Sequence, residues 1–360
     1  MPWPISRRGK VALEGIREKL SREKVGAFLV SKLVNVRYLS GFTGSSAFIL
    51  ISSQDLFFVT DPRYGEQASS QIPPSFDLVV LKPGERLSSF IKGKGWSSVA
   101  VEDALTLAQY NSLKEGLEGM ELVIWKGVVE AARKIKGPWE LERIREAVAL
   151  AQEAFSGLKE RMHPGVVEKD FALELEFFMR RRGAEGVAFP FIVASGFRSA
   201  LPHGEASSKT IDDGDLVVLD FGVRWRGYHS DMTRTLKFGE WQGWERDIYR
   251  VVLDAQQAAL DAIGPGVEAK EVDAVARRIV EEAGYGEFFG HGLGHGVGLE
   301  IHEAPTLSPT SQDVLEEGMV FTVEPGVYLP GKGGVRIEDM VYLGSGGPEV
   351  LTSLPKEVEG

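Results

Sequence analysis

The sequence predicts an α+β protein in which an alternating α/β segment precedes a larger domain of paired helices and antiparallel strands. Its length of 360 residues is typical of two domains. In the first third, short apolar runs alternate with helical patterns. Beyond residue 138, a pair of helices followed by strands occurs twice. We expect these helices to cover one face of a curved antiparallel sheet, which leaves the other face free for a site.

The elements of the first domain, expected over residues 1–128, are predicted from periodicity. Apolar residues between positions 11 and 20 recur at helical spacing, which predicts a helix. Strands are predicted at 25–30, 47–51, 56–59, 78–81 and 99–101, with a hairpin between the second and the third. The segment contains no histidine, so we expect the chemistry in the second domain.

The second domain, expected over residues 129–360, begins with a strong helix signal. Pro138 is a favoured first helical residue, and apolar side chains then recur every three or four positions up to Met162. The predicted helices are 138–162, 166–182, 244–263 and 269–283, and the predicted strands are 187–193, 216–223, 228–236, 298–301, 320–328 and 335–343.

Composition excludes several classes of function. A net charge of −11 argues against nucleic acid or an anionic membrane as the main partner. The absence of cysteine excludes disulfides, thiolate zinc sites and a cysteine nucleophile. No apolar run approaches the roughly 20 residues that span a bilayer, and no secretory signal is evident. We therefore expect no membrane partner and a cytoplasmic location.

A glycine-rich segment at residues 291–303, HGLGHGVGLEIHE, holds three of the six histidines. Imidazole is the commonest metal ligand and titrates near neutral pH. Glycines let the backbone approach a site closely. The spacing does not decide which of His291, His295 and His302 is a ligand.

Four carboxylates in strand-like contexts complement these histidines. Asp220 ends an apolar run, Asp231 and Glu324 lie in similar segments, and Arg336 and Glu338 share one face of a predicted strand. A carboxylate at the end of a buried strand costs much desolvation energy unless it is paired or metal-bound. Asp220 alone is also consistent with a turn cap, and Arg336 with Glu338 is also consistent with a surface ion pair.

Taken together, two aspartates, two glutamates and a histidine make up the donor set that a pair of divalent ions needs. Oxygen ligands with one nitrogen suit manganese, cobalt or zinc better than copper. The pattern predicts metal-assisted hydrolysis.

The segments at 291–303 and Ala194–Gly204, with those around the four carboxylates, resemble proline-specific metallopeptidases of family M24, prolidase and aminopeptidase P. The resemblance covers residues 130–350 and extends more weakly to Asn35–Ser45. It implies a pita-bread catalytic domain, with two αβ halves around a curved sheet, behind a creatinase-like N-terminal domain.

The resemblance also assigns roles to residues. Asp231 and Glu338 would bridge two metal ions, Asp220 would hold one, and His295 with Glu324 would hold the other. Glu324 would be the general base. The other catalytic residues implied are His203, His291 and His302, and the substrate-binding residues implied are Phe189, His203, His302, Tyr328 and Arg336.

The implied reaction is hydrolysis of the bond before proline by a hydroxide activated by two divalent ions, with manganese expected and cobalt or zinc as alternatives. The substrates would be Xaa-Pro dipeptides or longer peptides with proline second; the sequence does not decide between them. A homodimer is expected. A methionine aminopeptidase-like exopeptidase is an alternative that Leu201–Gly204 and the N-terminal domain disfavour. The complete ligand set disfavours both a metal-free creatinase and a non-catalytic peptide-binding module.

Overall fold

The computed structural model describes residues 7–356 and divides into two compact units, which are described separately. The first unit ends at Arg133, the last residue of helix α6 (Val128–Arg133), and the second begins at Lys134. The sequence analysis placed the boundary slightly earlier, at residue 128. Within residues 7–356, no helix is long and apolar enough to cross a membrane.

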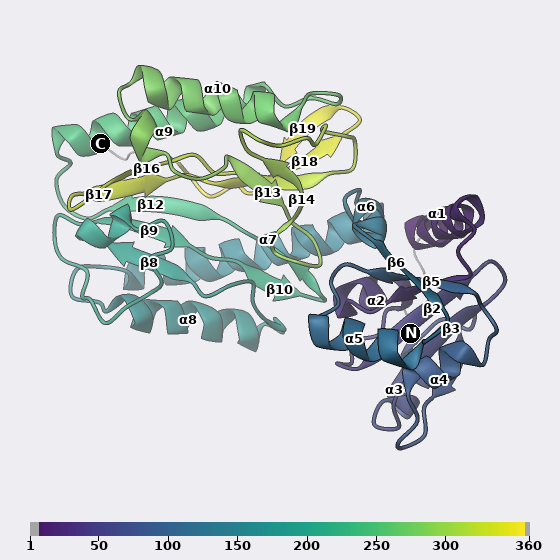
Figure 1. Cartoon of the computed structure of the whole chain (residues 1–360). Coiled ribbons are helices and arrows are strands. Elements are labelled where there is room, and N and C mark those ends of the chain that lie inside the picture. Colours follow the sequence, from purple (N-terminus) through teal and green to yellow (C-terminus); the bar gives the residue numbers. More distant parts are fainter. Residues whose placement is uncertain (1–6, 357–360) are drawn as a thin grey trace. The chain divides into compact units, whose positions relative to one another are not determined.

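The first unit is built on a six-stranded mixed sheet with the order β4-β3-β2-β1-β5-β6 (Figure 1). The predicted hairpin is confirmed, because β2 and β3 pair antiparallel, whereas β5 pairs parallel with both β1 and β6. Its strands are β1 (Ala27–Val30), β2 (Ala47–Ser52), β3 (Leu56–Thr60), β4 (Asp77–Val80), β5 (Ser98–Glu102) and β6 (Glu121–Trp125). Its other helices are α1 (Arg7–Glu23), α2 (Leu33–Ser40), α3 (Gly65–Gln71), α4 (Leu87–Lys92) and α5 (Leu107–Gly116).

The first half of the second unit places two helices over short antiparallel strands. Alanine, leucine and phenylalanine side chains of both helices pack against β9 in one apolar core. The elements are α7 (Pro138–Leu158), α8 (Glu168–Arg181), β7 (Gly186–Val187), β8 (Ile192–Ser195), β9 (Leu216–Asp220), β10 (Val223–Trp225), β11 (Tyr228–His229) and β12 (Thr233–Lys237). Pro138 is the first residue of α7, as predicted.

The second half repeats the arrangement with its own core. Its helices are α9 (Gly243–Asp261) and α10 (Ala269–Glu282). Its strands are β13 (Gly294–Gly296), β14 (Glu303–Leu307), β15 (Val320–Val323), β16 (Gly326–Leu329), β17 (Gly333–Arg336), β18 (Asp339–Gly344) and β19 (Gly347–Val350). Figure 1 shows α9 and α10 on one side of the strands and α7 and α8 on the other.

Strand boundaries are where the structure departs from the predictions. The predicted strand at 298–301 is wrong: these residues form a loop between β13 and β14, with a local hydrogen bond from Gly298 N–H to the Glu300 carbonyl at 3.0 Å. The predicted strands at 216–223, 228–236, 320–328 and 335–343 are each interrupted. Apolar residues lie on both sides of each interruption, so hydrophobic periodicity alone does not reveal it, although Gly222 and Pro325 mark two of the breaks.

The two halves are joined where β12 lies beside residues 336–338. The Glu338 N–H donates to the Thr233 carbonyl at 3.1 Å, and the Thr235 hydroxyl donates to the Arg336 carbonyl at 2.8 Å. The inner layer of strands is therefore continuous across the halves, and side chains from both can face one pocket.

Candidate metal centre

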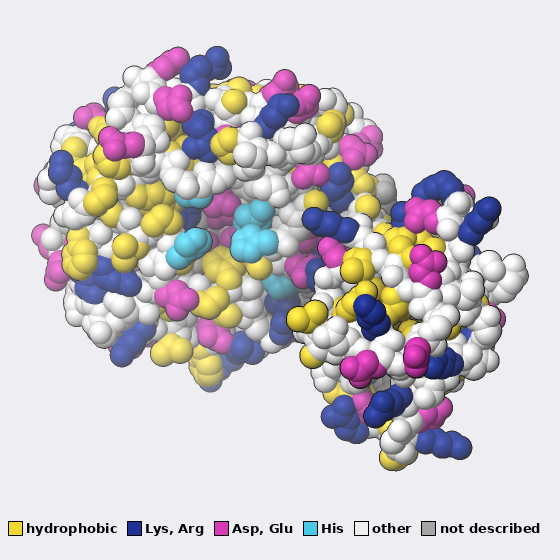
Figure 2. Space-filling view, in the orientation of Figure 1, with side chains coloured by type: hydrophobic (Ala, Val, Ile, Leu, Met, Phe, Trp, Pro, Cys, Tyr) yellow, Lys and Arg dark blue, Asp and Glu magenta, His cyan; other side chains and the backbone are white. Residues whose placement is uncertain are grey.

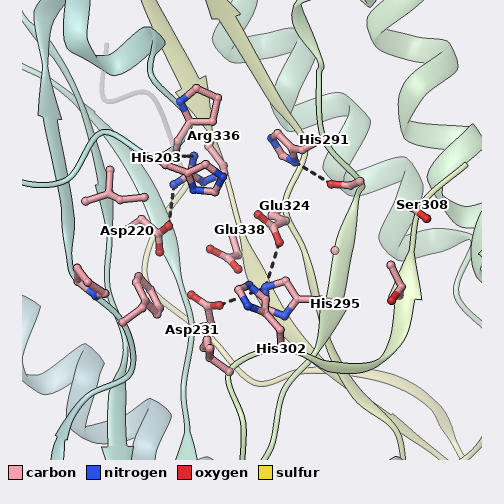
Figure 3. A pocket seen from close by; sticks show the side chains of 18 of the residues that line it. His203, Asp220, Asp231, His291, His295, His302, Ser308, Glu324, Arg336 and Glu338 are labelled. Carbon is pink, nitrogen blue, oxygen red and sulfur yellow. Dashed lines mark hydrogen bonds and ion pairs between the residues drawn. The ribbon is translucent and has the colours of Figure 1, made fainter. Parts of the chain in front are cut away.

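A pocket of about 400 Å³ lies between the two halves of the second unit and contains all five expected metal ligands. Asp220 and Asp231 come from the first half, and His295, Glu324 and Glu338 come from the second. Figure 3 shows these side chains converging, and Figure 2 shows the histidines gathered in a hollow of the surface.

The carboxylates are positioned by the interruptions in the strands. Asp220 is the last residue of β9, whereas Asp231, Glu324 and Glu338 lie in short gaps between consecutive strands. At these points the backbone leaves one ladder and enters another, so side chains of separate sheets point at a common space. The interruptions that hydrophobic periodicity did not reveal are thus the feature that assembles the site.

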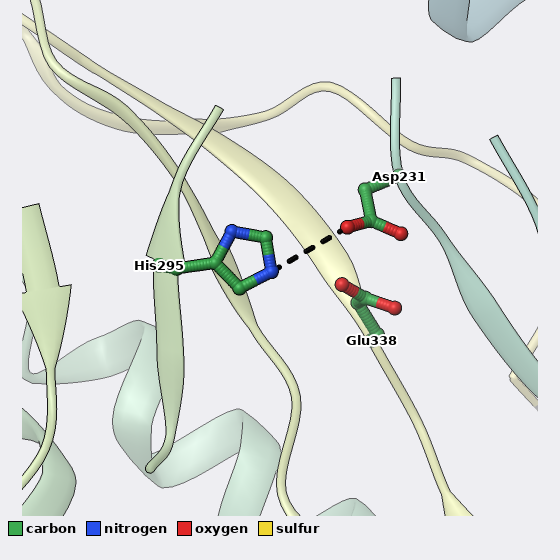
Figure 4. Close-up of side chains that lie close together, drawn as sticks. All are labelled: Asp231, His295 and Glu338. Carbon is green, nitrogen blue, oxygen red and sulfur yellow. Dashed lines mark ion pairs between the residues drawn. The ribbon is translucent and has the colours of Figure 1, made fainter. Parts of the chain in front are cut away.

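The Nε2 atom of His295, which carries no proton, faces the carboxylates of Asp231 and Glu324. Figure 4 shows the contact with Asp231. The Nδ1 atom of His295 lies 3.1 Å from the Gly296 carbonyl, which can only accept, so Nδ1 carries the proton. Burial lowers the pKa of His295, and the neutral ring then has a lone pair on Nε2. That nitrogen lies 3.5 Å from Asp231 Oδ2 and 3.4 Å from Glu324 Oε1. Three acceptors facing one another repel unless a cation lies among them.

Two further carboxylate oxygens lack partners. Among the described residues, Asp220 Oδ1 and Asp231 Oδ1 are buried without a hydrogen bond. Asp220 Oδ2, by contrast, accepts from Arg336 Nη2 at 2.7 Å. Buried polar atoms are nearly always paired, so unpartnered anionic oxygens in a pocket point to a missing cation.

The electrostatics give the same indication. Burial, followed by repulsion from Glu338, Asp220 and Glu324, raises the pKa of Asp231 well above its ordinary value. Burial is also the main cause of the raised pKa values of Glu338 and Glu324. Ligand atoms of Asp231, His295 and Glu338 lie within 4.8 Å of one another. The donor set, the bare nitrogen and the orphaned oxygens all fit divalent metal ions.

The remaining histidines differ in what their rings contact. His291 Nδ1 lies 2.7 Å from the Gly292 carbonyl and therefore carries the proton, while its Nε2 lies 2.9 Å from the Tyr328 hydroxyl. Burial lowers the pKa of His291, so the neutral ring accepts from Tyr328 and has no N–H left. His203 and His302 line the same pocket, and within residues 7–356 neither ring has a hydrogen bond.

Arg336 and Tyr328 form a support behind the ligands. Arg336 is buried and makes four side-chain hydrogen bonds, to Asp220, Thr233, Tyr328 and the Pro202 carbonyl. The Tyr328 hydroxyl accepts one of them at 2.9 Å and donates to His291. The expected substrate-binding residue Phe189 lines the pocket wall with Pro190, Ile192 and Ile301.

Two glycines of the histidine segment are required by close backbone contacts. A Cβ at Gly294 would collide with the Thr322 carbonyl, and a Cβ at Gly296 would collide with the Ala304 carbonyl. Both flank His295 on β13. Any side chain at these positions would push β13 away from its neighbours and move the His295 nitrogen.

Sequence reasoning missed two threonines that touch the ligands. The Thr233 hydroxyl donates to Glu338 Oε2 at 2.6 Å, and the Thr322 hydroxyl donates to Glu324 Oε1 at 3.0 Å. Thr233 lies two positions after Asp231, and Thr322 lies two positions before Glu324. In a strand, side chains two positions apart point to the same face, so the sequence could have indicated that these threonines lie on the ligand face.

Comparisons with known proteins identify the family of the chain. The model of metallopeptidase family M24 matches residues 142–345, and that of the creatinase/prolidase N-terminal domain matches residues 13–135. The chain is 39% identical over 347 residues to an Xaa-Pro dipeptidase of Pyrococcus horikoshii, covering 95% of this chain and 97% of that one.

Two solved structures extend the likeness to the fold. One is an Xaa-Pro dipeptidase from Bacillus anthracis, with a TM-score of 0.93 and 42% identity over 97% of this chain and 99% of that one. Another is an X-Pro aminopeptidase from Thermotoga maritima, with a TM-score of 0.86 and 39% identity over 94% of this chain and 99% of that one. The predicted pita-bread domain and creatinase-type N-terminal domain are confirmed, and the chain belongs to metallopeptidase family M24.

Proposed function

We propose that this chain is an Xaa-Pro peptidase that uses two divalent metal ions to cleave the bond before proline. The observation that carries the proposal is the convergence of four carboxylates and the bare Nε2 of His295 on one pocket. The substrate class is supported by relatives named Xaa-Pro dipeptidase and X-Pro aminopeptidase. Both names occur at similar identity, so substrate length is a question for assay.

The five ligands divide into bridging and terminal positions in this proposal. Asp231 and Glu338 would be shared by the two ions, Asp220 would hold one of them, and His295 with Glu324 would hold the other. Manganese is the ion we expect, and cobalt and zinc suit the same donors. When bound, such ions supply an activated water and a positive charge beside the scissile carbonyl.

Glu324 is the proposed proton acceptor for the attacking water. Its Oε1 is held by the Thr322 hydroxyl at 3.0 Å, so the carboxylate has a fixed direction. Burial raises the pKa of Glu324 in the metal-free pocket, and bound cations would favour the carboxylate form that accepts a proton. A base held in place and tuned in this way contributes about 10²–10⁴-fold to such reactions.

His203 and His302 are the proposed donors to the carbonyl oxygen of the substrate as it gains charge. Their rings line the pocket without internal hydrogen bonds among the described residues. Burial, with the nearby His295 and His203, lowers the pKa of His302, so this ring is a neutral donor at pH 7. We assign His291 a different part, because its ring is occupied on both sides and holds the Tyr328 hydroxyl that Arg336 also contacts.

Proline is accommodated, in this proposal, by the apolar wall of Phe189, Ile192 and Pro202. An Xaa-Pro bond is a tertiary amide with a ring on its nitrogen and no N–H to donate. An apolar wall contacts such a ring without leaving a polar group of the protein unpaired.

A substrate panel tests the proposal. The protein is stripped with a chelator, reloaded in turn with manganese, cobalt or zinc, and assayed on Xaa-Pro, Xaa-Pro-Xaa and the matched Xaa-Ala and Met-Ala peptides. We expect cleavage only of proline-containing substrates. Preferred cleavage of Met-Ala would favour a methionine aminopeptidase-like enzyme. No turnover together with no bound metal would favour a binding module.

A further inference from the structure

The segment Ser195–Ser207 carries His203 into the pocket as a loop with a narrow neck. It leaves the end of β8, and its returning strand meets the same β8 at an isolated bridge between Ile192 and Glu205. The Ala206 N–H then donates to the Phe191 carbonyl at 3.1 Å. The ends of the loop are therefore adjacent, and His203 lies two residues before the Glu205 bridge and four residues before Ser207.

One carboxylate, Glu168, binds both sides of this neck. Its Oε1 accepts from the backbone N–H and the hydroxyl of Ser195, both at 2.8 Å. Its Oε2 accepts from the backbone N–H of Ser207 at 3.0 Å and from the Ser207 hydroxyl at 2.6 Å. Arg198 adds an ion pair at 2.5 Å from within the loop. Glu168 is fully buried at the start of α8 and outside the pocket.

The far part of the loop is tied to the other half of the unit. The Ser199 hydroxyl accepts from Gly334 N–H at 2.8 Å, and the Pro202 carbonyl accepts from Arg336 Nη1 at 3.0 Å. Gly334 and Arg336 both belong to β17. Glu168 and β17 thus hold the loop from opposite halves.

His203 depends on this backbone for its position. The residue is exposed on the pocket rim, and within residues 7–356 its ring makes no hydrogen bond. The loop backbone, rather than a partner of the imidazole, therefore decides where the ring lies. A shift of about 1 Å in such a group is enough to cost on the order of 100-fold in rate.

We propose that Glu168 is a positioning residue that sets His203 in the pocket by closing the neck of the Ser195–Ser207 loop. The inference rests on the proposed function of the pocket and adds a residue to it. The carboxylate form is required because five donors converge on its two oxygens. A glutamine in either orientation points an NH₂ group at donors and opens one side of the neck.

Glu168→Gln is the first test, with manganese loading and kcat/KM on an Xaa-Pro peptide measured together. We expect unchanged metal stoichiometry and a loss in kcat/KM of up to about 100-fold. In the His203→Ala background, Glu168→Gln should change kcat/KM by less than about twofold, the scatter of independent sites. Full additivity of the two losses would overturn the proposal, because a general structural effect does not pass through His203.

Two variants control for the fold. Glu245→Gln removes a comparable buried carboxylate in the first turn of α9, which accepts from Gln242 N–H and Lys237 Nζ but lies outside the pocket. It should leave kcat/KM unchanged per folded molecule. Ser207→Ala removes one hydroxyl from the neck and should give a smaller loss in the same direction if Glu168→Gln does not fold.

A spectroscopic readout separates this proposal from the proposed activity. With histidine-labelled protein, the ring resonances of His203 should shift in Glu168→Gln, while those of His229, which does not line the pocket and lies 3.0 Å from the Gly298 carbonyl, should not. An unshifted His203 overturns the positioning role even in an active enzyme. A shifted His203 in a protein that cleaves no Xaa-Pro peptide would uphold the positioning role and reject the proposed function.

Discussion

Two neighbouring carboxylates, Glu338 and Asp339, show how one chain distinguishes a site from a structural pair. Both are buried, and each accepts a threonine hydroxyl at 2.6 Å, Glu338 from Thr233 and Asp339 from Thr352. They face opposite ways. Glu338 lines the pocket among other carboxylates, whereas Asp339 binds the buried Arg234 at 2.8 Å and Lys356 at 2.6 Å.

The surroundings move the two pKa values in opposite directions. Burial, with repulsion from Glu324 and Asp220, raises the pKa of Glu338 well above its ordinary value. Burial alone would also raise the pKa of Asp339, but Arg234 and Lys356 outweigh it and lower that pKa. The protein therefore supplies the counter-charges of Asp339 itself and leaves those of Glu338 to be supplied from outside. This difference supports the proposed metal site and separates it from a buried salt bridge.

Removing Asp231, a carboxylate proposed to contact both metal ions, should have the largest effect on activity. We expect Asp231→Asn to reduce kcat/KM on an Xaa-Pro peptide by at least about 100- to 1000-fold, with loss of bound metal. The metal-free variant should melt no lower than the metal-free wild type, because the change removes a carboxylate that repels its neighbours. Elemental analysis, kinetics and thermal melts check these points. Full activity at matched metal loading would contradict the two-metal assignment.

Asp339→Asn should do the reverse: lower stability and leave metal binding intact. It leaves Arg234 buried without its carboxylate, a change that typically costs about 3–5 kcal/mol. Urea unfolding at matched metal loading measures this loss in the free energy of unfolding. Glu349→Gln, which breaks the half-exposed pair with Arg145, is the control and should cost at most about 1 kcal/mol. A loss of metal stoichiometry in Asp339→Asn would mean that the two carboxylates are not functionally separate.

The sequence predicted much of this contrast but not its geometry. All five expected ligands lie in the pocket. The strand-like contexts drew attention to the four carboxylates, whereas the resemblance to family M24 implied the choice of His295 and the complete set. The opposite environments of Glu338 and Asp339 follow from strand alternation. Periodicity alone does not predict the strand interruptions at Asp231, Glu324 and Glu338, because apolar residues lie on both sides of each, although Pro325 and Gly326 mark the break at Glu324. The role of His291 also depends on hydrogen bonds to Gly292 and Tyr328 that no pattern encodes.

The same contrast predicts a pH dependence of stability for the metal-free protein. Asp231, Glu324 and Glu338 have raised pKa values, so their stabilising contribution is full below their unfolded pKa of about 4. It is lost as pH rises through their folded pKa values. This contribution by itself lowers the melting temperature of the metal-free protein as pH rises, whereas His291 and His295, whose pKa values burial lowers, contribute stability that is lost as pH falls below their unfolded pKa of about 6.5.

Metal should remove most of that decline, because it binds the deprotonated ligands. Asp339 acts with the opposite sign: its lowered pKa contributes stability above its unfolded value, and this is lost as pH falls through the folded value. Asp339→Asn should flatten the acid side of the profile and leave the alkaline decline. Thermal melts of wild type and Asp231→Asn, with chelator and with manganese, give both sides. Equal declines with rising pH in the two metal-free proteins would contradict the raised pKa of Asp231.

The smallest expected effects come from Thr233 and Thr352, whose hydroxyls donate to Glu338 and Asp339. Thr352→Val and Thr233→Val each delete one hydroxyl with little change in volume, and each hydroxyl donates at 2.6 Å to one of the neighbouring carboxylates. Thr352→Val should lower stability by about 1.5–3 kcal/mol, as for a hydrogen bond to a charged group, and leave metal affinity unchanged. Thr233→Val should weaken metal affinity by about 10- to 100-fold, because the hydroxyl orients a ligand. Titration of metal into both stripped variants distinguishes them. Equal affinities would show that the orientation of Glu338 is fixed by its backbone alone, since its N–H is already bound by the Thr233 carbonyl.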